Sequence, residues 1–180
     1  GSEFMPPLYE EDLLYMPITG PGISIAEARR LLIWQDQQIK SVPEVTRVFG
    51  KPGRAQSALD PAPLSMFETV VQLKPRDQWR PGMTFARLQT EMDDALQFPG
   101  FPNVWTQPIR NRLDMLLTGI KTPVGIKVFG PKLDVIQGIG EQIEGILRRV
   151  PETRSVYAER VSQGYFTDIR INREAIGRYG

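Results

Sequence analysis

Hydrophobic and polar residues in the first hundred positions follow the periods of short strands and amphipathic helices. Residues 10–18 have the composition of a short strand, and Gly20-Pro21-Gly22 predicts a turn after it. Ser24, with Glu27 three positions later, predicts the start of a helix that ends before Pro43. The apolar positions expected on one broad face of this helix are Ile25, Ala28, Leu32, Trp34, Ile39 and Val42.

Three further strands and a second helix are predicted after this helix. Residues 45–49 and 65–73 have strand character, and the alternation in the latter predicts one face formed by Phe67, Thr69, Val71 and Leu73. Residues 50–64 are rich in Gly, Pro, Ala and Ser, which predicts a long loop. Thr84 is expected to cap a helix that reaches Leu96, and residues 104–106 predict a fourth strand. The order strand, helix, strand, strand, helix, strand is that of an α+β, ferredoxin-like split βαβ domain.

A similar succession of predicted strands and helices begins again near residue 124. Residues 124–129, 154–158 and 165–171 predict strands, residues 133–150 predict an amphipathic helix, and a short helix is expected to start near residue 172. Ser41-Val42-Pro43-Glu44 is echoed by Arg149-Val150-Pro151-Glu152, each at the end of a predicted helix, which suggests duplication. We therefore expect a complete subdomain over residues 1–107, a linker over 108–121 that lines a cleft, and a second, incomplete ferredoxin-like subdomain over 122–180.

Composition excludes several kinds of chemistry. The 180 residues include 22 Lys and Arg against 21 Asp and Glu, and no Cys or His. A net charge near zero disfavours nucleic-acid binding. The lack of Cys and His excludes disulfides, thiol and His-dependent catalysis, and the usual zinc and haem sites. No apolar run reaches the roughly 18 residues of a membrane span, so we expect this stretch to be soluble and without a signal peptide.

Any soft-metal chemistry must then come from the six methionines. A single Met is usually flexible packing material. In a ferredoxin-like sheet, however, the end of the first strand meets the start of the third, so Met16 and Met66 become cross-strand neighbours if they share a face. Glu68 would lie on the face of Met66, and Met115 falls in the predicted linker. Three thioethers favour Cu(I) or Ag(I) over Zn²⁺, Mg²⁺ or Ca²⁺, and they carry no proton to lose.

Several strings resemble one protein family: GSEFMPPLYEEDLLYMP, SVPEVTRVFGK, QLKPRDQWRPGMT and PIRNRLDMLLTGIKTPVGIKVFG. They are similar to the heavy-metal efflux branch of resistance-nodulation-division (RND) pumps, and most of all to its copper/silver members. The resemblance implies a transporter part, not an enzyme: one complete periplasmic porter subdomain and the start of the next, from a Gram-negative inner-membrane protein. One departure is Tyr9-Glu10-Glu11, where Asn-Glu-Gly is common in the family.

The resemblance also implies a site and partners. Local motifs place the family's metal ligands on Met16, Met66 and Met115, and its charged cleft residues on Asp60, Glu68, Arg112 and Lys121. The cargo would be Cu(I) or Ag(I), with no organic cofactor, exported by a proton-driven homotrimer. A periplasmic adaptor (membrane fusion) protein and an outer-membrane channel would complete the assembly.

Two alternatives keep the methionines purely structural. One is a ferredoxin-like module that binds a small organic molecule between its two units. The other is an RND porter domain for organic substrates, with an apolar pocket built from Trp34, Trp79, Trp105 and the phenylalanines. Silver binding that depends on the three methionines would distinguish the metal hypothesis from both.

Overall fold

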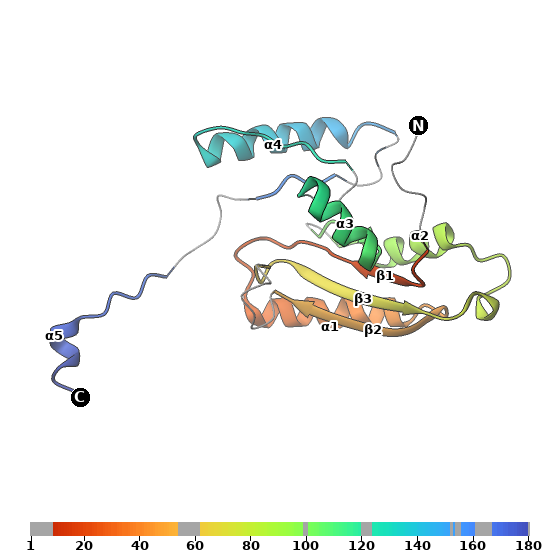
Figure 1. Cartoon of the computed structure of the whole chain (residues 1–180), viewed down its shortest axis with the longest axis horizontal. Helices are drawn as coiled ribbons and strands as arrows, with labels where there is room; N and C mark the ends of the chain where they lie inside the picture. Colours follow the sequence, from red (N-terminus) through yellow and green to blue (C-terminus); the bar gives the residue numbers. More distant parts are fainter. Residues whose placement is uncertain are drawn as a thin grey trace.

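A computed structural model describes residues 9–53, 62–98, 101–119, 124–151, 153, 156–160 and 167–179. The elements up to residue 106 are β1 (Asp12–Tyr15), α1 (Ile25–Lys40), β2 (Val45–Pro52), β3 (Phe67–Leu73), the short 3₁₀ helix η1 (Arg76–Gln78), α2 (Phe85–Ala95) and β4 (Trp105–Thr106). The strands make one 4-stranded antiparallel sheet in the order β2-β3-β1-β4 (Figure 1). This is the ferredoxin-like order, and the predicted succession of strands and helices is confirmed.

The core lies between one face of the sheet and the helices α1 and α2. The alternation predicted for β3 is confirmed, since Phe67, Thr69, Val71 and Leu73 are buried and the residues between them are more exposed. Met92 on α2 is fully buried in this core, which makes it a packing residue. The opposite face of the sheet is left for other contacts.

Helix α1 begins where the sequence predicts, because the Ser24 hydroxyl accepts a hydrogen bond from the Glu27 N–H at 3.2 Å. Its buried face differs from the prediction in part: Ile25 is 77% exposed, whereas the buried stripe includes Leu31 and Gln35. Gln35 is tolerated there because its amide donates to the Thr69 hydroxyl at 2.6 Å. Hydrophobicity alone could not reveal that pairing.

The segment expected to be a linker contains a helix, α3 (Pro108–Thr118). Proline stands at the start of the helix, and Gly119 ends it in the left-handed conformation with φ of 69°. Both are ordinary helix-boundary signals, so the sequence did carry this information. Figure 1 shows α3 lying across β1, which it contacts.

The second half agrees with the prediction only in its helices, α4 (Leu133–Leu147) and α5 (Arg173–Ile176). The strand prediction for residues 124–129 is wrong, as is the described part of those for 154–158 and 165–171, since residues 124–129, 156–158 and 167–171 are not in a strand. Residues 154, 155, 165 and 166 lie outside the described residues. A strand needs a hydrogen-bonded neighbour, and alternation alone does not supply one. The second subdomain therefore stays a prediction.

Within the described parts of the chain, no helix combines the length and the apolar character needed to cross a bilayer.

Candidate metal centre

Met16 and Met66 lie where β1 and β3 run side by side. The antiparallel register pairs Tyr15 with Thr69 and continues to an isolated bridge between Ile18 and Met66. This register places Met16 opposite Glu68 and one diagonal step from Met66. Because side chains alternate along a strand, Met16, Met66 and Glu68 share one face of the sheet. That face is the one turned away from the core formed by α1 and α2, since Tyr15 and Phe67 belong to that core.

Backbone hydrogen bonds fix both methionines. The Met16 N–H donates to the Val104 carbonyl at 2.9 Å, and the Met66 carbonyl accepts from the Gly53 N–H at 2.8 Å. Met16 is only 2% exposed, whereas Met66 is partly buried. Met16 thus comes directly after β1 and Met66 directly before β3, where these backbone hydrogen bonds hold both residues beside the sheet.

Met115 comes from α3. It lies in the second half of that helix with 38% of its surface exposed, and its Sδ lies 3.5 Å from the Asn111 Nδ2, one turn earlier. The helix that carries Met115 contacts β1, the strand that leads into Met16 (Figure 1). The three predicted ligands are therefore on two adjoining strand ends and on the helix that packs against them.

The start of α3 is held by Glu10, a contact that sequence analysis missed. Its two carboxylate oxygens accept from the backbone N–H groups of Ile109 and Arg110 at 2.6 and 2.9 Å, and its own N–H donates to the Gln107 side chain at 2.8 Å. The acidic run Glu10-Glu11-Asp12 carried the signal, because a carboxylate is favoured at a helix N-terminus. Its partner lies about a hundred residues away, so spacing could not identify it.

The charged residues predicted for the cleft are placed unevenly. The Glu68 carboxylate forms a salt bridge of 2.9 Å with Lys51 of the neighbouring strand, and both side chains are 33% exposed. Arg112 is exposed on α3, beside an ion pair of 3.8 Å between Arg110 and Asp114. Asp60 and Lys121 lie outside the described residues. Within the described ranges, no group of three or more His, Cys, Asp or Glu is placed to hold a metal.

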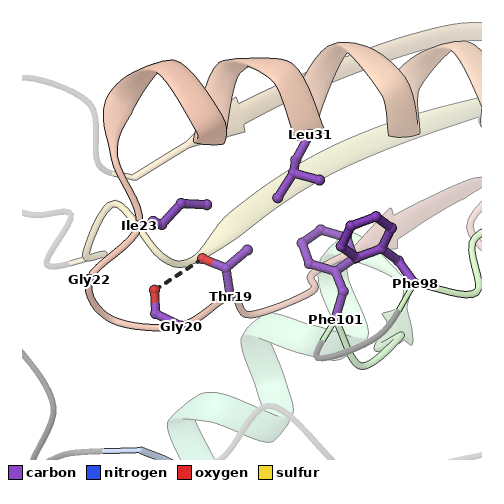
Figure 2. A pocket seen from close by; sticks show the side chains of 7 residues that line it. All are labelled: Thr19, Gly20, Gly22, Ile23, Leu31, Phe98 and Phe101. Atoms are coloured by element: carbon purple, nitrogen blue, oxygen red, sulfur yellow. Dashed lines mark hydrogen bonds between the residues drawn. The ribbon is translucent and has the colours of Figure 1, made fainter.

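Two pockets lie away from the methionines. Figure 2 shows the first, an open, mainly apolar pocket of about 290 Å³ in which Phe98 and Phe101 face Leu31. Its other lining residues are Thr19, Gly20, Gly22 and Ile23. The second, of about 460 Å³, is lined by both halves of the chain, with Asn103 and Asp93 from the first and Tyr157 and Arg160 from the second.

The tryptophans expected to form an aromatic pocket line neither cavity. Trp79 donates to the Lys74 carbonyl at 2.7 Å, and Trp105 donates to the Asp93 carboxylate at 3.0 Å. Trp34 packs against Phe98, with ring centroids 5.7 Å apart. Among the described residues, each of the three tryptophans thus has a separate partner, and the alternative of a pocket built from them and the phenylalanines stays a prediction.

Comparison with known proteins assigns this arrangement to a family. The model of the AcrB/AcrD/AcrF family matches residues 1–180. The chain belongs to this family. It is 54% identical to the cation efflux system protein CusA of Escherichia coli K12 and 55% identical to the putative cation efflux system protein SilA of Salmonella typhimurium. Each match covers 100% of this chain and 17% of the relative. The resemblance to a segment of a CusA/SilA-type heavy-metal efflux protein is confirmed.

More distant members of the AcrB/AcrD/AcrF family carry other metals in their names. The chain is 30% identical over 183 residues to the cobalt-zinc-cadmium resistance protein CzcA of Cupriavidus metallidurans. The fold resembles the crystal structure of a heavy metal efflux pump with a TM-score of 0.84 at 26% identity, covering 99% of this chain and 19% of that one. These relatives are named as efflux and resistance proteins, which agrees with a transporter part rather than an enzyme. The chain spans under a fifth of their length.

Proposed function

We propose that this chain is the periplasmic porter region of a proton-driven RND pump that exports Cu(I) or Ag(I). The ion would bind Met16, Met66 and Met115 in a cleft between the complete subdomain of residues 1–107 and the second one of residues 122–180, with residues 108–121 lining it. The observation that carries the proposal is the register of β1 and β3, which puts Met16 and Met66 on one face beneath the helix that holds Met115.

The chemistry of the donors supports a soft monovalent cargo. Thioether sulfur binds Cu(I) and Ag(I) well and offers little to Zn²⁺. Glu68, on the same face, adds a negative charge that attracts a cation, and it is moderated by its ion pair with Lys51. The thioethers lose no proton on binding, so affinity for the ion should vary little with pH above the range in which carboxylates titrate.

The same proposal places the chain in an assembly. The ion would be captured when the cleft is open and passed on when it closes, as in alternating access driven from membrane helices outside this segment. We propose a homotrimer in the inner membrane with this region in the periplasm, joined to an adaptor protein and an outer-membrane channel. The sequence similarity to CusA and SilA supports this placement.

Silver titration by calorimetry in chloride-free buffer tests the site directly. The wild-type chain should bind one Ag(I), and the triple variant Met16→Ile, Met66→Ile, Met115→Ile should bind none. The matched control is Met83→Ile, because Met83 packs against the core cluster and should leave silver binding unchanged. Zn²⁺ should give no heat. Equal silver binding by wild type and triple variant would refute the assignment of ligands.

One observation favours the small-molecule alternative, namely the pocket lined by both halves of the chain. If that pocket carried the function, silver would leave the melting temperature unchanged, and the substitution Met16→Ile would act only through packing. A thermal melt of the wild-type chain with and without Ag(I) separates these outcomes. A rise in melting temperature that the triple variant lacks would support the metal site.

A further inference from the structure

The most buried described side chain of α3 is a polar one. Asn111 is 6% exposed, while the apolar residues Ile109 and Leu116 on the same helix are 59% and 76% exposed. A helix that packs on a sheet normally buries its apolar residues and exposes its amides. Asn111 therefore occupies a position at which an aliphatic side chain would stabilise the fold better.

The hydrogen bonds of Asn111 point to the metal site. Its Nδ2 lies 3.5 Å from the Met115 Sδ, within the range of a hydrogen bond to sulfur. Its Oδ1 is buried and has no partner among the residues that the structure describes. A buried carbonyl without a partner destabilises the folded state. The backbone N–H of Asn111 makes an ordinary helical bond to the Gln107 carbonyl at 2.8 Å, so the residue does not serve as a cap.

We propose that Asn111 is a positioning residue that holds the Met115 Sδ in place for the ion. The inference rests on the proposed function and deepens it. A thioether sulfur has two lone pairs, and an amide that occupies one leaves the other for Cu(I) or Ag(I). Met has three rotatable side-chain bonds and Met115 is 38% exposed, so without this contact its sulfur samples many positions. Ordering it in advance removes that entropic cost from ion binding.

The geometry of the other two proposed ligands explains why such a contact matters most for Met115. Met16 is 2% exposed and Met66 is partly buried, and both are next to strands with fixed backbone bonds. Close packing already limits the rotamers of these side chains. Met115 lies on a helix surface, where an added hydrogen bond has the most effect.

The test combines NMR of methionine methyl groups with silver titration. The chain is labelled with ¹³C at each methionine methyl, the Met115 signal is assigned with Met115→Ile, and the variants Asn111→Leu and Asn111→Ala are compared with wild type. Leu116→Ala is the control, since it alters an exposed residue of α3. We expect the Met115 methyl signal to move to the shift of a freely rotating side chain in both Asn111 variants. Silver affinity should fall about three- to tenfold, the cost of ordering one flexible side chain.

Stability distinguishes positioning from packing. Asn111→Leu removes the unpaired carbonyl, so the melting temperature should stay the same or rise while silver affinity falls. A lower melting temperature in both variants, together with weaker binding, would mean that Asn111 is structural and would overturn the inference. An unchanged Met115 methyl signal, or a changed signal with unchanged silver affinity, would also overturn it. Failure of the wild-type chain to bind Ag(I) is a separate result, which would overturn the proposed function first.

Discussion

The Glu10 carboxylate accepts a hydrogen bond of 2.6 Å from the backbone N–H of Ile109, and so ties the residues before β1 to the first turn of α3. Its other oxygen accepts from the Arg110 N–H at 2.9 Å. Since Pro108 has no N–H and that of Asn111 bonds within the helix, these contacts satisfy the start of α3. Glu10 thereby sets the position of the helix that carries Met115 relative to the strand that leads to Met16.

Replacing Glu10 should weaken both the fold and the site. Glu10→Ala leaves two N–H groups without their acceptor and removes a negative charge from a helix N-terminus, so we expect a loss of about 1–2 kcal/mol in the free energy of unfolding. Silver affinity should fall with it, because α3 is less firmly held. Urea unfolding and calorimetry measure the two effects, with Glu174→Ala in α5 as the control. Stability and silver affinity equal to those of wild type would contradict this role of Glu10.

Lys51 should slow the arrival of a cation by pairing with Glu68. In Lys51→Gln the Glu68 charge is no longer balanced across the strands, so Ag(I) should associate about two- to fivefold faster at low ionic strength. The enhancement should fade as nitrate salt is added, because ions screen exposed charges. Stopped-flow kinetics measure the association rate of Ag(I), and Glu68→Gln, which removes the negative charge, should make association slower. Faster association in both variants would mean that the electric field of Glu68 plays no part.

Local signals in the sequence were sufficient to predict most of the helices and strands before residue 107. The Ser24 and Thr84 caps and the alternation of β3 each depend on residues within a few positions of one another, and all three are as predicted. Pro108 and Gly119 bound α3 equally clearly, yet the segment was interpreted as a linker because it lies between two repeats. The prediction of a linker over residues 108–121 left the helix within that segment unassigned.

The features of the structure that the sequence did not predict depend on contacts between residues far apart in the chain. Glu10 and Ile109 meet only because β1 and α3 pack together, and Gln35 is buried only because Thr69 lies within hydrogen-bonding distance. The strand predictions of the second half failed for a related reason: alternation at residues 124–129 was compatible with a strand, but pairing requires a neighbour. For the candidate site, the strand order made it foreseeable that the ends of β1 and β3 next to Met16 and Met66 meet. The role of Asn111 was not, because an Asn within a helix has no distinctive pattern.

Glu11 has a backbone conformation suited to glycine, with φ of 62°. In the left-handed region of φ and ψ, a residue with a Cβ is strained by roughly 1–2 kcal/mol relative to glycine. Glycine recovers only part of this difference, because it loses more conformational entropy on folding than other residues. Glu11→Gly should therefore raise the free energy of unfolding by up to about 1 kcal/mol, in line with the glycine common at this position in the family that the sequence resembles. Glu11→Ala should give no such gain, since alanine keeps the Cβ. Chemical denaturation of both variants tests this, and destabilisation by Glu11→Gly would contradict the argument.

The carboxylate of Glu44 makes stability depend on acid pH. Its side chain is 1% exposed and accepts hydrogen bonds from the Arg80 guanidinium at 2.7 and 2.8 Å, which lower the pKa of Glu44 despite its burial. A lowered folded-state pKa means that the carboxylate stabilises the protein above its unfolded pKa of about 4.3, and that this contribution is lost as the pH falls through the folded value. Stability should thus decline on acidification below about pH 4.3.

Glu44→Gln separates this group from the other carboxylates. The variant keeps an acceptor but loses the charge-assisted bonds, so it should be about 1–3 kcal/mol less stable at pH 7 and should lose less stability between pH 5 and acid pH than wild type. Glu91→Gln is the control, because Glu91 also binds Arg80 at 2.9 Å but is 41% exposed, and its removal should have a smaller effect. Urea unfolding at a series of pH values measures both. If Glu44→Gln lost stability with acid as steeply as wild type, the dependence would have to arise from other carboxylates.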